Sequence, residues 1–177
     1  MPSMRCMMTA GPALDRDNVA GYNCSYAPVD NIRVFDEIMY ILMCGTGVGF
    51  SVERQYINKL PIVPEELSKV CLSIHVADSK VGWATALKKY FASAFNDGAL
   101  CPLDTSKVRP AGAVLKTFGG RASGPEPLHE LIENLDLILK GARGRQLNSV
   151  ECHDIVCHIA SVVICGGVRR SALISLS

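Results

Sequence analysis

Hydrophobic residues recur with a helical period in four stretches of this chain. In each stretch the apolar side chains return every three or four positions, which places them on one face of a helix. The pattern predicts helices that begin near Asp30, near Asp78, after Ser123 and near Asn148. Their expected inward-facing residues are, helix by helix, Ile32, Phe35, Ile38, Met39 and Leu42; Trp83, Leu87, Tyr90, Phe91 and Ala94; Leu128, Leu131, Ile132, Leu135 and Ile138; and Cys152, Ile155, Val156, Ile159 and Val163.

Capping residues mark the ends of these helices. Asp30 is a candidate N-cap of the first helix. Residues 123–126 read Ser-Gly-Pro-Glu, which predicts a capping box with proline in the first turn, and Gly141 is the expected end of the helix that follows. Asn148 and Glu151 are expected to open the last helix.

Alternating apolar and polar residues predict strands at 48–52 and in the last seven residues, 171–177. Residues 1–28 read as irregular or short extended structure. Residues 55–76 carry two prolines and no clear period, so we expect a loop there. Helices that alternate with short strands indicate an α/β fold. Since no internal repeat is seen, a single domain is expected.

Composition narrows the functional classes. The chain has 177 residues, of which 49% are hydrophobic and 20% charged, and its formal net charge is +1. This balance is ordinary for a globular protein and gives no basic stripe for nucleic acid. No apolar run reaches the roughly 20 residues that cross a bilayer, and the N-terminal segment does not read as a signal peptide. The expectation is a cytoplasmic protein without nucleic-acid or membrane partners.

Cysteines and histidines raise two further questions. The eight cysteines are irregularly spaced with no CxxC pair, so reduced thiols that pack as small hydrophobes are expected, not a disulfide scaffold. Cys152, His153, Cys157 and His158 imitate metal ligands. However, Cys152 belongs to an apolar stripe and no second ligand pair has zinc-like spacing, so the prediction is no metal site.

Three glycine-rich stretches each follow an apolar run. They are MCGTGVGF (43–50), FGGRASGP (118–125) and CGGVRRSA (165–172). Glycine lets the backbone approach a ligand closely, and free backbone N–H groups can hold anions. Three such stretches, two of them with arginine, suggest a site for a phosphorylated molecule of nucleotide size. The first stretch follows a helix and precedes a strand, so it is not a Rossmann fingerprint.

Five segments, in order, resemble ribonucleotide reductase, most of all the adenosylcobalamin-dependent class of bacteria and their phages. They are PSMR (2–5), GYNCSY (21–26), LMCGTGVGFSVER (42–54), VRPAGAVLKTFGGRASGPEPL (108–128) and GGVRRSALISL (166–176). The similarity spans nearly the whole chain. Two features depart from the family: complete reductases are several times longer, and the Asn-Pro-Cys-Gly-Glu motif around the radical-forming cysteine is absent.

The resemblance implies a fold and a domain organisation. In that family a ten-stranded α/β barrel, made of two parallel five-stranded halves, encloses a loop that carries the radical cysteine. This chain would be a single partial domain over 1–177, the first half of the barrel, with an insertion between barrel strands over about 55–107. In monomeric members of the family such an insertion builds the effector site that others make across a dimer.

The resemblance also implies a chemistry. In the family, adenosylcobalamin supplies a 5′-deoxyadenosyl radical from which a thiyl radical is made, and a pair of cysteines then reduces the ribose 2′ position and becomes a disulfide. The match of segment 21–26 makes Cys24 the first member of that pair. Its partner, the thiyl cysteine and a carboxylate of the finger loop would lie beyond Ser177. Taken without the resemblance, Cys24 would be an ordinary thiol.

Substrate contacts follow from the same matches. Ser3 would face the substrate phosphates and Asn23 a ribose hydroxyl, although a frayed terminus and local backbone bonding are the alternatives. The backbone at Gly47 and Gly49 would lie against the substrate base, and Arg169 would reach the substrate from the second specificity loop. As an isolated sequence, the Arg169-Arg170 pair reads as solvated.

Effector contacts form a second group. Asp30 would bind the effector deoxyribose, a role that competes with helix capping for the same carboxylate. Lys116 and the loop with Gly119, Gly120 and Arg121 resemble the first specificity loop, where effector phosphates bind.

The resemblance thus implies a reductase fragment that is inactive alone. Its partners would be a ribonucleotide, as di- or triphosphate, a dNTP effector, the remainder of the reductase and a thioredoxin-like reductant, with the cofactor held mainly by the remainder. The alternative is a stand-alone dNTP-binding or regulatory module without catalysis. A third reading is a gene that is split or interrupted by an intein.

Overall fold

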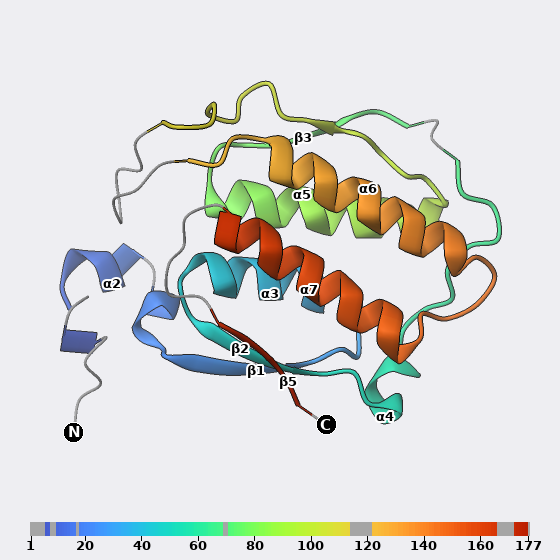
Figure 1. Ribbon diagram of the computed structural model, residues 1–177, viewed down its shortest axis with the longest axis horizontal. Coiled ribbons are helices and arrows are strands. Elements are labelled where there is room, and N and C mark those ends of the chain that lie inside the picture. Colours follow the sequence, from blue (N-terminus) through green and yellow to red (C-terminus); the bar gives the residue numbers. More distant parts are fainter. Residues whose placement is uncertain are drawn as a thin grey trace.

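The computed structural model describes residues 6–7, 10–16, 18–68, 71–113, 122–165 and 172–176. Helices and strands alternate along these ranges (Figure 1). In chain order they are α2 (Pro12–Arg16), η1 (Asn18–Gly21), β1 (Cys24–Pro28), α3 (Val34–Met43), β2 (Gly47–Ser51), α4 (Arg54–Ile57), β3 (Ile74–His75), α5 (Lys80–Ala92), the π-helical turn η2 (Ser93–Asp97), β4 (Leu103–Asp104), α6 (Glu126–Gly141), α7 (Ser149–Cys165) and β5 (Leu173–Ser175).

The main sheet has three parallel strands in the order β1-β2-β5. In its register Cys24 lies opposite Gly47, and Gly49 lies opposite Ile174. Parallel strands need crossover connections, usually helical. Here α3 links β1 to β2, and the longer connection from β2 to β5 contains α5, α6 and α7. The N-terminal ends of all three strands therefore lie at the same end of the sheet.

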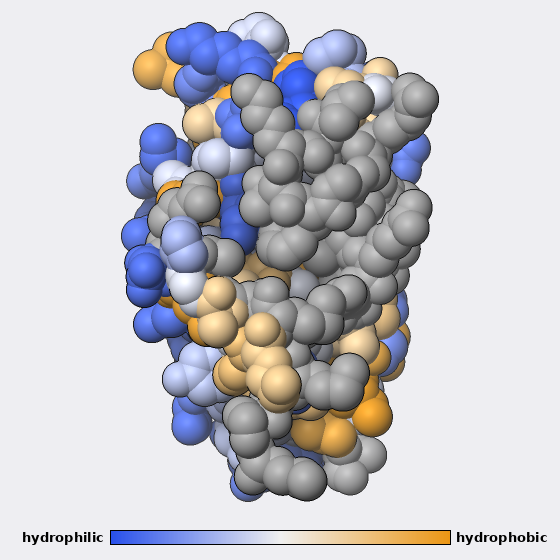
Figure 2. Space-filling model, turned by 90° about the vertical axis from the view of Figure 1, so that its left-hand side faces the viewer, coloured by the Kyte–Doolittle hydropathy of each residue, from blue (hydrophilic) through white to orange (hydrophobic). Residues whose placement is uncertain are grey.

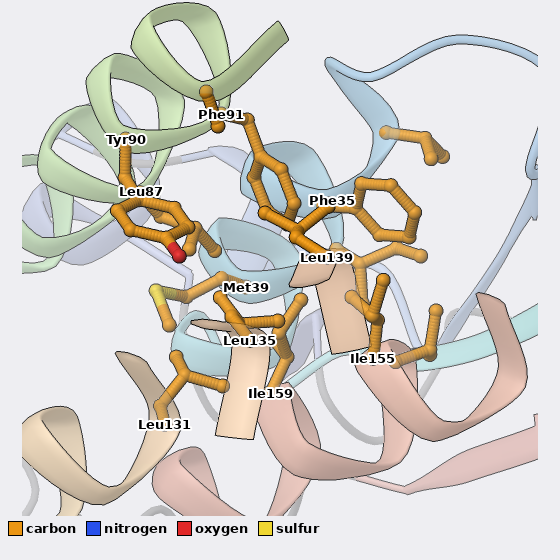
Figure 3. Close-up of a cluster of buried hydrophobic side chains, with 14 of the residues drawn as sticks. Phe35, Met39, Leu87, Tyr90, Phe91, Leu131, Leu135, Leu139, Ile155 and Ile159 are labelled. Carbon is orange, nitrogen blue, oxygen red and sulfur yellow. The ribbon is translucent and has the colours of Figure 1, made fainter. Parts of the chain in front are cut away.

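Helices α3, α5, α6 and α7 pack together on one side of this sheet (Figure 1). Their apolar faces meet in a common core, in which aromatic and aliphatic side chains of all four helices point toward one another (Figure 3). The rings of Phe35 and Phe91 stack at 4.9 Å between centroids. Tyr90 is fully buried and its hydroxyl donates to Asp136 Oδ1 at 2.6 Å. Burial raises the Tyr90 pKa, and the hydrogen bond to Asp136 raises it further.

The four helices predicted from periodicity are confirmed, and so is the strand of residues 48–52, but two predicted helix starts are wrong. The first helix begins at Val34 rather than near Asp30, because a turn intervenes in which Asn31 Oδ1 accepts from the Arg33 N–H. The capping box at 123–126 does not form, since Pro125 is the N-cap of α6 and no side chain caps it.

At the last helix the predicted cap does form. Asn148 Oδ1 accepts from the Glu151 N–H and Glu151 Oε2 accepts from the Asn148 N–H, both at 2.9 Å. Arg145 also pairs with the Glu151 carboxylate. These contacts lower the Glu151 pKa, the side-chain bond from Arg145 being the largest cause.

Residues 55–76, predicted as loop, contain regular structure. Besides α4, strand β3 pairs in parallel with β4, which lies beyond α5 and η2. Cys71 and Cys101 form a disulfide beside this small sheet, so the expectation that the cysteines are reduced is wrong for these two. Two paired residues per strand are too few to give a periodic pattern, which explains why the sequence did not reveal them.

The structure is thus mixed α/β with parallel strands, as the sequence predicted. The described ranges hold three strands of the main sheet and do not close into a barrel. No helix within those ranges is both long and apolar enough to cross a membrane.

Candidate functional site

The main sheet has a covered face and an open face. On the covered face Val48 and Phe50 of β2 are buried, and the Phe50 ring lies 5.5 Å from the His153 ring of α7. Side chains alternate along a strand, and paired residues share a face. Cys24 and Tyr26 of β1 therefore lie on the open face. There Tyr26 is 52% exposed, an uncommon position for a large ring.

Two glycines of β2 lie next to Cys24 and Tyr26 on the open face. Gly47 is the register partner of Cys24, and Gly49 is that of Tyr26. A Cβ on Gly49 would come within 2.8 Å of Leu176 Cδ1, and one on Gly47 within 3.4 Å of the Asn23 carbonyl oxygen. A side chain at Gly49 would therefore displace its neighbour. Gly47 is half-buried, whereas Gly49 is buried and has the side chains of Leu176 and Ile174 against it.

Cys24 is the most accessible thiol of the described part of the chain. Of the free cysteines there, Cys24 is exposed, Cys6 and Cys157 are half-buried, and Cys44 and Cys152 are buried. Burial raises the pKa of Cys152 to about 12, and it also raises the pKa of Cys157. The thiolate is the reactive form of cysteine, so neither of these two is prepared for thiol chemistry.

The sequence-predicted substrate residues that can be located come together at one edge of the sheet. Asn23 directly precedes Cys24, and its carbonyl accepts from the Gly47 N–H at 2.9 Å. Ser25 Oγ donates to the Gly47 carbonyl at 3.0 Å. Ser3 and Arg169 lie outside the described residues. Arg169 belongs to the segment that precedes Ala172, whose carbonyl accepts from the Val48 N–H at this same edge.

Asp30 is not part of this group. It follows the C-terminal end of β1, six residues after Cys24, so at about 3.3 Å per extended residue the two lie at most about 20 Å apart, at opposite ends of the strand. Its carboxylate accepts from Asn31 Nδ2 at 2.8 Å and lies 3.8 Å from Lys59 Nζ. Nearby, a hydrogen bond with Tyr26 is the largest cause of a raised Tyr56 pKa.

The two predicted specificity loops attach to the opposite end of the molecule from Asp30. Lys116, Gly119, Gly120 and Arg121 are outside the described residues, but their flanks are joined by the bond from the Ala122 N–H to the Ala113 carbonyl. These flanks lead into the N-terminus of α6. Because α6 and α7 are antiparallel neighbours, that terminus lies near the C-terminus of α7, where the other loop starts (Figure 1).

This end of the molecule carries charged and apolar groups together. Figure 2 views it directly, and the described residues there include both hydrophilic and hydrophobic ones. At the start of α5, Arg109 Nε donates to Asp78 Oδ2 at 2.8 Å, and Lys80 Nζ lies 3.5 Å from Cys44 Sγ. The sequence analysis named Asp78 only as the approximate start of a helix and did not pair it with Arg109, because the pairing spans 31 positions.

The histidine and cysteine cluster of α7 behaves as packing. Cys152 is fully buried and faces the core, whereas Cys157 Sγ lies 3.6 Å from His153 Nδ1. Within the described ranges no three metal-ligating side chains are close enough together to hold an ion.

Comparisons with known proteins define the class. Residues 53–139 match the family model described as the B12-dependent ribonucleotide reductase insertion domain. The structure superimposes on a crystal structure of a B-12-dependent (class II) ribonucleotide reductase with a TM-score of 0.77 and 24% sequence identity, over 98% of this chain and 31% of that one. The fold is thus that of part of a class II reductase.

Curated relatives agree with this class. An adenosylcobalamin-dependent ribonucleoside-triphosphate reductase of Levilactobacillus brevis is 32% identical over 192 residues, covering 86% of this chain and 26% of the relative. One of the same name from Euglena gracilis is 30% identical, over 86% of this chain and 21% of the relative. The chain belongs to the B12-dependent ribonucleotide reductase family, and it spans about a quarter of the length of these relatives.

Proposed function

We propose that this chain contributes the amino-proximal part of an adenosylcobalamin-dependent ribonucleotide reductase, with Cys24 as one member of the redox cysteine pair. The observation that supports this most directly is the placement of Cys24. It is an exposed thiol on the open face of a parallel sheet, directly opposite Gly47 of β2. The same residues lie in segments 21–26 and 42–54, which resemble the family in sequence.

The proposed reaction uses Cys24 as a two-electron donor together with a second thiol from the remainder of the reductase. Oxidation of two thiols to a disulfide releases two electrons and two protons. These are what is needed to replace the ribose 2′ C–OH by C–H with loss of water. The disulfide is then returned to two thiols by exchange with an external dithiol of the thioredoxin type. Asn23 and the backbone at Gly47 and Gly49 would position the ribose and base.

The cofactor enters this proposal through the relatives, which are named for their dependence on adenosylcobalamin. When bound, it supplies the radical that starts the reaction. One surface groove lies beside Arg54 and Asn148, which respectively follow the C-terminal end of β2 and precede α7, away from Cys24. In this proposal the remainder of the reductase holds the cofactor, and Cys24 acts only in the thiol step.

For the effector we propose the end of the helical bundle where residues 114–121 and 166–171 attach. Lys116, Gly119, Gly120 and Arg121 would hold the phosphates of a dNTP there, and Arg169 would reach from the second loop toward the ribonucleotide. Attachment of both segments at one end supports this. The role of Asp30 as a deoxyribose ligand stays a prediction, and its position at the other edge of the sheet does not support it.

The second candidate is a stand-alone dNTP-binding or regulatory module. The closed core of α3, α5, α6 and α7 favours it, because this bundle buries its apolar faces without further chain. The two hypotheses predict different reading frames next to the gene. A neighbouring reading frame that encodes the rest of the barrel and restores turnover would support the reductase. Micromolar dNTP binding by the chain, with no complementing frame, would support the module.

The central experiment replaces Cys24 by serine in the assembled reductase. Serine keeps the size and the hydrogen bonding of cysteine but cannot form a disulfide. We expect multiple turnover with a dithiol reductant to be lost while ribonucleotide binding is retained. Cys157→Ser is the matched control, because Cys157 is a half-buried thiol on α7, and it should keep turnover within about twofold. Unchanged steady-state turnover in Cys24→Ser would contradict the redox assignment.

A further inference from the structure

Thr46 is a polar side chain enclosed in the core between α3 and β2. It is 1% exposed, and its hydroxyl lies 2.9 Å from the carbonyl oxygen of Val19 and 2.9 Å from that of Tyr22. A hydroxyl has a single proton to donate, so the two carbonyls share it in a three-centre bond. Both acceptors belong to the segment that leads into β1. A buried threonine with this geometry ties that segment to the start of β2.

The next residue continues the same attachment. The Gly47 N–H donates to the Asn23 carbonyl at 2.9 Å, and the Gly47 carbonyl accepts from Ser25 Oγ at 3.0 Å. Residues 46 and 47 thus hold the backbone on both sides of Cys24. Cys24 itself is the register partner of Gly47. Cys24 is exposed, and among the described residues no hydrogen bond holds its sulfur, so the backbone alone sets where the thiol lies.

The position of a redox thiol has narrow tolerance. A disulfide forms only when the two Cβ atoms approach to about 3.5–4.5 Å, and misplacement of a reacting group by about 1 Å can cost about a hundredfold in rate. We propose that Thr46 is a positioning residue for Cys24. Its hydroxyl fixes residues 19–22, and thereby the start of β1, so that the Cys24 thiol can reach the second thiol of the redox pair. This inference rests on the proposed function for its chemical part.

Two substitutions at Thr46 separate the hydroxyl from the packing. Thr46→Val keeps the shape of the side chain and removes the proton that the carbonyls of Val19 and Tyr22 accept from Thr46. The Val19 carbonyl keeps its bond from the Tyr22 N–H, so the attachment to Thr46 alone is lost. Thr46→Ser keeps the donor. In the assembled reductase we expect Thr46→Val to lower kcat by about tenfold or more, with the KM for ribonucleotide changed less than about twofold. Thr46→Ser should recover kcat to within about threefold.

Amide hydrogen exchange gives a readout that does not depend on turnover. Thr46→Val should speed exchange in peptides that cover residues 18–26 by about tenfold, and leave α6 unchanged. Tyr90→Phe is the control, because it removes a buried hydroxyl bond in the helical core, far from Cys24. It should lower thermal stability to a similar extent with kcat retained. If Thr46→Val does not fold, Thr46→Ala replaces it, since it removes the hydroxyl without adding a methyl group in its place.

Each outcome of these experiments supports or overturns a stated part of the proposal. Loss of kcat with faster exchange at 18–26, both reversed in Thr46→Ser, supports the proposal. Unchanged exchange at 18–26 overturns the attachment, and unchanged kcat with faster exchange overturns its importance for the reaction. A loss of kcat in Tyr90→Phe as large as in Thr46→Val reduces Thr46 to general stability. If Cys24→Ser retains turnover, the proposed function fails and the positioning role fails with it, whereas exchange still reports the attachment.

Discussion

In the helical part of the molecule, α3, α5, α6 and α7 cover one another, whereas the three-stranded sheet is covered on one side only. Leu135 and Phe35 are fully buried among the helices, while Tyr26 and Ile174 are more than half exposed on the open side of the sheet. Burial of apolar area is the main source of stability, at about 25 cal/mol per Å². The bundle therefore supplies most of the stability, and the sheet carries the candidate site.

The helical bundle and the sheet therefore have different roles in this chain. The helical core covers one side of the sheet. Cys24, the candidate redox group, lies on the other side, which the described residues leave exposed. The chain covers about a quarter of the length of its curated relatives. Mutations in the two regions should therefore have separable effects.

The largest expected effect is in the bundle. Leu135→Ala removes a fully buried side chain from the middle of α6 and should lower the free energy of unfolding by about 3–4 kcal/mol, through lost transfer energy and a residual cavity. The matched control is Leu137→Ala on the same helix, where the side chain is 68% exposed and the change should stay below about 0.5 kcal/mol. Urea denaturation measures both. Equal losses in the two variants would contradict the assignment of the core.

How far the sequence predicted each region follows from the range of the interactions. The helices were found because periodicity is a local signal, and their inward residues, such as Leu135 and Ile155, are buried as expected. The cap at Asn148 was found for the same reason. The predicted cap at Asp30 failed because a local motif does not show where the preceding turn ends.

The candidate site was predictable only in part. Cys24, Gly47 and Gly49 were singled out through the family resemblance, and the structure brings them together on one face of the sheet. Thr46 was passed over because nothing in the sequence shows that its hydroxyl is buried against the carbonyls of residues 19 and 22, more than 20 positions earlier. Pairings over such separations depend on the folded topology, which a local pattern does not encode.

The second prediction tests the cap that holds α7 over the sheet. The Glu151 pKa is lowered in the folded chain, so the ionised carboxylate stabilises the fold above the unfolded-state pKa of about 4.5 and this contribution is lost as the pH falls through the folded-state pKa. Glu151→Gln should cost about 0.5–1 kcal/mol at pH 7, and the difference from the parent should vanish toward pH 3.

Urea midpoints measured between pH 7 and pH 3 check this prediction. Glu133→Gln is the control, because Glu133 is exposed on α6, and its difference from the parent should stay near zero throughout. A cost for Glu151→Gln that stays constant with pH would show that the charge of Glu151 does not contribute, and that the cap acts through neutral hydrogen bonding alone.

The smallest effect on stability, and the sharpest test of the comparison, is expected on the open face of the sheet. Ile174 of the edge strand β5 is 60% exposed there, and together with Leu176 it lies against Gly49 of β2. An exposed apolar edge strand is a site for self-association, which a lysine suppresses. Ile174→Lys should change the free energy of unfolding by less than about 0.5 kcal/mol and shift the isolated chain toward monomer in sedimentation velocity runs over a range of concentrations.

Val81→Lys is the matched control, since Val81 is also 60% exposed but lies on α5, within the helical layer. If both lysine variants reduce association equally, the open face has no special role. If the parent chain is already a monodisperse monomer with a sharp melting transition, the sheet needs no covering partner, and the stand-alone binding module becomes the better account of this chain.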